Sequence, residues 1–153
     1  MKKILLFLCV ATLLAQASEL KKVSFDEYLG SFDYKERNDM KIKTPDMQAL
    51  VEEGKAILVD IRFREEYEAW HIAGSVNIPL NELPKRFSEL PKDKLIVTAC
   101  PHNDRSNMAR LFLTLHGYKA KYLNDGLLKT ADFLRGDNAR EYIEEISVHK
   151  KNK

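Results

Sequence analysis

The chain lacks an apolar run long enough to cross a bilayer comfortably, which argues against a membrane anchor. Its longest candidate, residues 4–14, follows two lysines and precedes the A-x-A pattern Ala15-Gln16-Ala17. A positive start, a short apolar stretch and small residues at a cleavage point are typical of a secretory signal peptide. We therefore expect residues 1–17 to be a signal peptide cleaved after Ala17. The mature protein would then be periplasmic, with no stable membrane span.

Cysteine is scarce, because only Cys9 and Cys100 occur among the 153 residues. Cys9 lies in the segment expected to be cleaved, so the mature chain would keep one thiol, and one thiol cannot form an internal disulfide. In an exported protein a lone cysteine is a reactive group or an intermolecular link, and the alternative is a buried cysteine that only packs. The scarcity of cysteine directs attention to Cys100.

Charge of one sign is also lacking. The full chain has 25 Lys and Arg against 23 Asp and Glu. Loss of Lys2 and Lys3 with the signal peptide would bring the mature formal charge to zero. Composition therefore gives no argument for a nucleic-acid partner or an acidic partner, and we expect no nucleic acid to bind.

Metal-ligand spacing is absent as well. The four histidines stand at no zinc-site spacing, either from one another or from the remaining cysteine: His71, His102, His116 and His149. We expect neither a metal nor another cofactor. His71 is expected to brace a turn and His116 to end a helix. His102 either tunes the nearby thiol or is a solvated surface residue, and His149 begins a frayed basic tail.

The chain has no internal repeat or low-complexity linker, and its length suits one domain. Residues 18–43 are polar and predict an N-terminal extension, loosely packed or with a short helix near Phe25 to Leu29. A domain over 44–136 and a C-terminal helix or tail over 137–153 follow. Strand-length apolar runs alternate with helical patterns: strands at 56–61, 76–78, 95–99 and 120–123, and helices at 44–53, 65–70, 81–90, 106–116 and 125–134. Such alternation predicts an α/β fold with a parallel sheet covered on both faces.

The segment from Cys100 to Ser106 lies between the strand pattern 95–99 and the helical pattern that follows it. Ligands of parallel sheets bind beyond the carboxyl ends of the strands, and Cys100 stands at such an end. The N–H groups and dipole of a helix N-terminus stabilise a thiolate there. Chemistry is therefore expected at Cys100.

Two separated blocks of sequence resemble the rhodaneses, a sulfurtransferase family. The stretch from Leu58 to Pro79, with Asp60, Arg62, Glu66-Tyr67 and His71-Ile72-Ala73-Gly74, is similar to the family's D-V-R, E-(Y/F), G-H-I-x-G-A and N-I-P signature. The loop from Cys100 to Arg105-Ser106 resembles the family's C-x4-R-S active loop. The two blocks, with Gly117-Tyr118 and Asp125-Gly126, span roughly residues 44–135. The resemblance to a single-domain rhodanese implies a three-layer fold around a mostly parallel, five-stranded sheet.

The resemblance also implies a mechanism. The Cys100 thiolate takes the outer sulfur of a donor such as thiosulfate or polysulfide, keeps it as a persulfide and passes it to a thiol or cyanide-like acceptor, or to a protein. The N–H groups of residues 102–106 would stabilise the sulfur. Arg105 would be its counter-cation, or would instead bond the carbonyls of the loop. The alternative to an enzyme is a periplasmic sulfur carrier that serves only a partner protein.

Loop length argues against phosphatase chemistry. Four residues separate Cys100 from Arg105, whereas the related phosphatases use a C-x5-R loop whose extra residue makes room for a tetrahedral oxyanion. The shorter loop suits a single sulfur.

Several residues depart from the common family pattern or have two open roles. Pro101 supplies no N–H, Asn103 replaces a glycine and is expected to tolerate positive φ, and Asp104 should disfavour a dianionic donor. Trp70 replaces another glycine and is expected to pack. Asp60 and Arg62 are expected to brace the site or to contact it.

Overall fold

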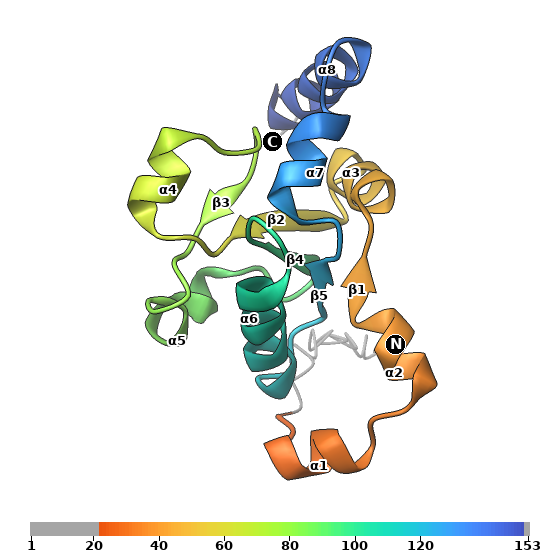
Figure 1. Ribbon diagram of the computed structural model, residues 1–153, viewed down its shortest axis with the longest axis vertical. Coiled ribbons are helices and arrows are strands. Elements are labelled where there is room, and N and C mark those ends of the chain that lie inside the picture. Colours follow the sequence, from red (N-terminus) through yellow and green to blue (C-terminus); the bar gives the residue numbers. More distant parts are fainter. Residues whose placement is uncertain (1–21, 152–153) are drawn as a thin grey trace, which may run out of the picture.

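Five parallel strands form the centre of the molecule in the computed structural model, which describes residues 22–151. The strands are β1 (Lys41–Ile42), β2 (Ala56–Asp60), β3 (Val76–Asn77), β4 (Leu95–Ala99) and β5 (Ala120–Leu123). Their order is β1-β5-β4-β2-β3, so β4 lies in the middle of the sheet (Figure 1). All four strand pairs are parallel. The α/β fold with a parallel five-stranded sheet is confirmed.

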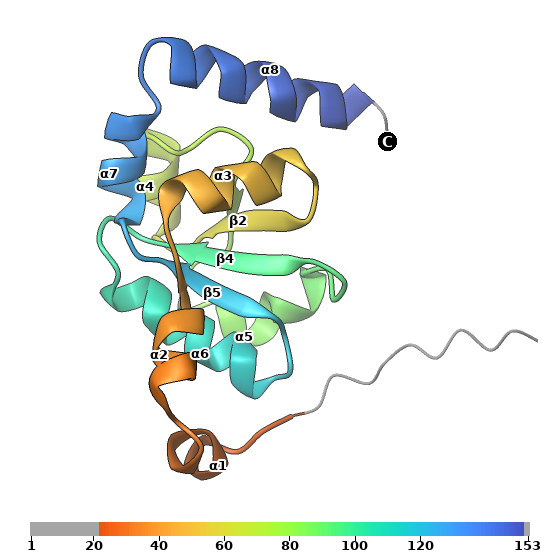
Figure 2. The same cartoon turned by 90° about the vertical axis from the view of Figure 1, so that its right-hand side faces the viewer.

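Helices cover both faces of this sheet. They are α1 (Phe25–Gly30), α2 (Tyr34–Asp39), α3 (Thr44–Glu52), α4 (Arg64–Ala69), α5 (Leu83–Arg86) with the following 3-10 turn Phe87–Glu89, α6 (Asp104–Leu115), α7 (Gly126–Phe133) and α8 (Asp137–Lys151). Figure 2 shows α3, α7 and α8 on one face and α5 and α6 on the other. None of the helices within residues 22–151 is long and apolar enough to cross a membrane.

The alternation of side chains along β4 divides the core into two halves. Ile96 and Cys100 pack with residues of α6 in one buried cluster. Val97 and Ala99 pack in the other cluster, with residues of α3, α7 and α8. Because successive strand residues point to opposite faces, this register places Cys100 on the same side of the sheet as α6.

The fifth strand comes from the segment that the sequence assigned to the N-terminal extension. Lys41 and Ile42 of β1 pair with Tyr122 and Leu123 at the edge of the sheet. The sequence pattern did not predict this strand, because two residues are too few to show any periodicity. The expected signal peptide, residues 1–17, lies outside the described residues.

The same extension is anchored to α6 by polar contacts. Arg110 of α6 is buried, and it donates to the Tyr28 hydroxyl at 2.5 Å and to the carboxylate of Glu36. The Tyr28 hydroxyl also donates to Glu36 at 2.9 Å. The buried guanidinium ties both α1 and α2 to α6, so this part of the extension is not loosely packed.

Two helix ends differ from the sequence expectations. The helix expected over 44–53 begins at Thr44 and ends at Glu52, and the Thr44 N–H donates to the Asp125 carboxylate at 2.8 Å. The C-terminal helix α8 continues to Lys151, so residues 149–151 are helical rather than frayed. Tyr142 holds α8 in place, because its buried hydroxyl donates to the Ala73 carbonyl at 3.0 Å.

Candidate active site

Cys100 follows β4 directly and lies under the N-terminal turn of α6, as the sequence pattern predicts. The Ser106 N–H points to Sγ at 3.4 Å, and the thiol S–H donates to Oδ1 of Asp104 at 3.5 Å. Among the N–H groups of residues 102–106, that of Ser106 is the one hydrogen-bonded to the sulfur. The thiol therefore has one donor and one anionic acceptor as neighbours.

Cys100 has no exposed surface. The residues around it on the loop are more open, because His102, Asn103 and Asp104 are all exposed and Pro101 is half-buried. A reactant can therefore reach Sγ only if the loop moves. Cys100 is also a member of a buried core cluster, so the alternative role of a cysteine that only packs agrees with its position.

Arg105 is held by a residue far away in the sequence. Its two terminal nitrogens donate to the two carboxylate oxygens of Glu66 on α4, at 2.8 and 3.0 Å. Neither sequence-based role for Arg105, counter-cation of the sulfur or partner of loop carbonyls, describes this contact. The Arg105 guanidinium lowers the pKa of Glu66, and Glu66 raises the pKa of Arg105. A paired fork of this kind is strong and directional.

Asp104 has a lowered pKa because the Arg105 backbone N–H, then the Cys100 thiol, donate to its carboxylate. It is therefore ionised at neutral pH. Ser106, next along the loop, is buried, and its hydroxyl donates to the Asn103 carbonyl at 3.1 Å. These contacts give the loop a negative group beside the sulfur and a polar brace beneath it.

The N-terminus of α7 supports the loop from the other side. The Leu127 N–H donates to the Cys100 carbonyl at 2.9 Å, and the Leu128 N–H donates to the Pro101 carbonyl at 3.4 Å. Gly126 has φ +71°, and a Cβ at this position would lie 2.4 Å from the carbonyl oxygens of both Pro101 and His102. Only glycine fits so close to the loop backbone.

Positive φ at Asn103 is not needed, contrary to the sequence expectation. Asn103 has φ −149°, and no residue other than glycine has positive φ within the described part of the chain. Gly126 has the positive φ instead. In the sequence, Gly126 stood out only as part of the Asp125-Gly126 dipeptide. The Asp125-Gly126 pair, just before a helical pattern, is the signal that could have found it.

Asp60 and Arg62 form a buried ion pair behind the site. The Arg62 Nη2 donates to Asp60 Oδ2 at 2.6 Å and to the Trp70 carbonyl at 2.7 Å. The Trp70 ring covers the guanidinium, with 4.2 Å from Cζ to the ring centroid. Asp60 and Arg62 thus form a structural ion pair on which Trp70 packs, and their bracing of the Cys100 site stays a prediction.

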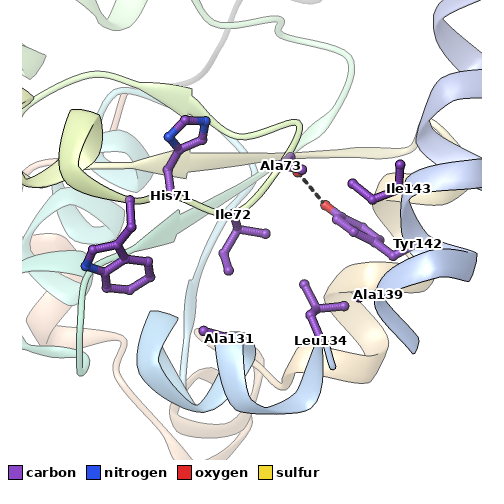
Figure 3. Close-up of a pocket in the computed structure, with 9 residues that line it drawn as sticks. His71, Ile72, Ala73, Ala131, Leu134, Ala139, Tyr142 and Ile143 are labelled. Carbon is purple, nitrogen blue, oxygen red and sulfur yellow. Dashed lines mark hydrogen bonds between the residues drawn. The ribbon is translucent and has the colours of Figure 1, made fainter. Parts of the chain in front are cut away.

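His71 does not join the loop residues. Its Nδ1 is hydrogen-bonded to the Tyr67 carbonyl at 3.0 Å, and its ring stacks on that of Tyr67, which braces the end of α4. His71 lines an apolar pocket of about 260 Å³ between residues 70–73 and helices α7 and α8; Figure 3 shows the residues around it. No residue of the Cys100 loop lines this pocket.

The remaining histidine expectations concern helix ends and metals. His116 follows the last residue of α6, and its Nδ1 is hydrogen-bonded to the Phe112 carbonyl at 2.8 Å. Among residues 22–151, no three His, Cys, Asp or Glu side chains gather as ligands for a metal ion. The side chain of His149 lies outside the described side chains.

The chain is similar to sulfurtransferases and to a sulfur carrier. It is 34% identical over 86 residues to the thiosulfate sulfurtransferase GlpE of Pseudomonas syringae, over 56% of this chain and 80% of GlpE. YrkF of Bacillus subtilis, named as a candidate sulfur carrier protein, is 42% identical over 62 residues, or 40% of this chain and 34% of YrkF. Against three of the curated relatives, YrkF among them, the chain spans 34% to 50% of the relative's length.

Among solved structures, the fold is also similar to that of a sulfurtransferase. The structure of the human single-domain sulfurtransferase TSTD1 matches with a TM-score of 0.55 and 28% identity, over 61% of this chain and 96% of TSTD1. A model of the rhodanese-like domain matches residues 44–132, which is more than half of the chain and includes the loop from Cys100 to Ser106. The chain therefore belongs to the rhodanese-like domain family.

Proposed function

We propose that the protein is a sulfurtransferase that carries sulfane sulfur as a persulfide on Cys100. The observation that supports this most is the position of Cys100 at the carboxyl end of β4, with the Ser106 N–H at the α6 N-terminus 3.4 Å from its Sγ. A thiolate or a terminal persulfide is an anion, and helix N-termini bind anions.

The proposed reaction has two steps. In the first, the Cys100 thiolate attacks the outer sulfur of a donor, an S–S bond to Cys100 forms, and the donor's own bond to that sulfur breaks with its electron pair leaving on the donor. In the second, a thiol or cyanide-like acceptor attacks the outer sulfur and the Cys100 thiolate leaves. The thiol proton must depart first, and Asp104 lies next to it as hydrogen-bond acceptor.

Burial of Cys100 makes movement of the loop part of the proposal. The Arg105–Glu66 pair joins the end of the loop to α4. We expect the pair to stay intact while the exposed residues before it, His102 to Asp104, move to open a path to the sulfur.

A second candidate function is a sulfur carrier that hands its sulfur only to a partner protein. The complete burial of Cys100 favours it, because small molecules have no open path to the thiol. The resemblance to YrkF points in the same direction. In both candidates the protein acts in the periplasm, as proposed from the signal-peptide pattern.

Steady-state sulfur transfer separates the two candidates. The mature protein is incubated with thiosulfate or polysulfide and cyanide, and thiocyanate is measured, with Cys100→Ser as the matched control. The enzyme proposal expects repeated turnover that Cys100→Ser loses. Less than one thiocyanate per protein molecule from every donor would contradict the enzyme and support the carrier. Turnover that Cys100→Ser retains would overturn both.

A further inference from the structure

The charge of the loop arginine is already paired with a carboxylate. Each of its terminal nitrogens donates one hydrogen bond to Glu66, at 2.8 and 3.0 Å. Arg105 and Glu66 are each about a third exposed, so the pair lies at the surface, where a donor would arrive. The positive charge of Arg105 is therefore neutralised at the mouth of the site.

A second carboxylate stands at the sulfur itself. Asp104 is exposed, and its Oδ1 is 3.5 Å from Sγ of Cys100. Arg62, which follows the strand paired with β4, is buried and paired with Asp60. The exposed imidazole of His102 is the remaining titratable group of the loop. With Arg105 cancelled by Glu66, Asp104 leaves the approach to the sulfur negative, and its carboxylate repels an anion that approaches the same sulfur.

We propose that Glu66 and Asp104 are specificity-determining residues, and that the donor is an organic hydropersulfide, R–S–S–H, rather than a dianionic oxoanion such as thiosulfate. This inference rests on the proposed persulfide on Cys100. A hydropersulfide reacts in its protonated form, which brings no negative charge past Asp104. It therefore avoids the repulsion that thiosulfate meets.

The chemistry of this donor balances without any further reagent. The Cys100 thiolate attacks the terminal sulfur of R–S–S–H, a new S–S bond forms between Cys100 and that sulfur, and the S–S bond of the donor breaks. The electron pair leaves on R–S⁻, which takes up the proton that Cys100 lost. The sum is Cys–SH plus R–S–SH giving Cys–S–SH plus R–SH.

The test compares two donors on three variants. Loading of Cys100 is followed by intact mass at low ionic strength, with thiosulfate and with 2-hydroxyethyl hydropersulfide, whose R group is uncharged. We expect the wild type to load faster from the hydropersulfide. Glu66→Gln and Asp104→Asn should each raise the ratio of the thiosulfate rate constant to the hydropersulfide rate constant about tenfold, because each removes one charge that repels only the anionic donor. Added salt should shrink the difference.

Glu68→Gln is the matched control, since Glu68 is exposed on the same helix as Glu66 and its loss changes the net charge equally. It should leave both rates unchanged. Equal rates from both donors in the wild type, or an unchanged donor ratio in Glu66→Gln and Asp104→Asn, would overturn the inference. Asp104→Asn decides the question if Glu66→Gln fails to fold. Loading of Cys100 from neither donor would instead defeat the proposed function.

Discussion

Replacing Gly126 by alanine should displace the Cys100 loop and abolish sulfur loading. The added Cβ would lie 2.4 Å from two carbonyl oxygens and 2.8 Å from the Cα of His102. All three are backbone atoms, which cannot rotate away as a side chain would. The positive φ of Gly126 adds strain on the order of 1–3 kcal/mol, and the overpacking adds about 1–3 kcal/mol more. Urea unfolding and the rate of persulfide formation measure the two effects.

Gly54→Ala is the matched control for this variant. Gly54 has nearly the same positive φ, +68°, but a Cβ there would meet nothing within 4 Å. Gly54→Ala should therefore be destabilised by the backbone strain alone, and it should load sulfur normally. If Gly126→Ala behaved like Gly54→Ala in both measurements, the contact between α7 and the loop would have no functional role.

Replacing Asp60 by alanine should destabilise the protein by about 3–5 kcal/mol, because it leaves the buried Arg62 charge without its carboxylate. The side chains of Asp60 and Arg62 are at most 2% exposed. The Asp60 carboxylate accepts from the Arg62 backbone N–H, Nε and Nη2, so one substitution removes every one of these bonds. The free energy of unfolding from a urea titration gives the loss.

The double variant Asp60→Ala with Arg62→Met isolates the uncompensated charge. Removing both charges of a buried pair is often nearly neutral, whereas removing one is costly. The double variant should therefore be more stable than Asp60→Ala alone. A double variant that is less stable than the single one would mean that Arg62 contributes mainly through the Trp70 contacts and not through the ion pair.

The parts of this fold that the sequence predicted best are those with strong local patterns. The runs 95–99 and 120–123 match β4 and β5 residue for residue. The first is a short, mostly apolar run, as expected of a buried parallel strand, whereas β5 contains Lys121 and is fully buried only at Tyr122 and Leu123. The position of Cys100 followed from the same pattern, since the end of β4 and the start of α6 lie on either side of a short loop.

The parts that the sequence missed depend on contacts between distant segments. The Arg105–Glu66 pair joins residues 39 positions apart, and no local period records such a contact. A loop arginine that needs a carboxylate, together with the glutamate of the first family block, was the available signal. The contact of Gly126 with the Pro101 and His102 carbonyls likewise arises only when α7 docks against the loop.

Asp104 shows how a residue can be noticed in the sequence while its contact is not. Its negative charge next to the sulfur was evident from the loop sequence. The structure adds two contacts that the loop sequence does not show: Glu66 neutralises Arg105, and Asp104 accepts from the Cys100 thiol. The charge balance at the sulfur is therefore more negative than the loop alone suggests.

The most direct test of the account is the intact mass of the mature protein after incubation with a sulfane-sulfur donor. We predict a gain of one sulfur atom in the wild type, removed by a reducing thiol, and no gain in Cys100→Ser. Peptide mapping should place the added sulfur on the peptide that contains Cys100. A wild-type protein that gains no sulfur from thiosulfate, polysulfide or 2-hydroxyethyl hydropersulfide, or a gain that Cys100→Ser retains, would contradict the central claim that Cys100 carries the sulfur.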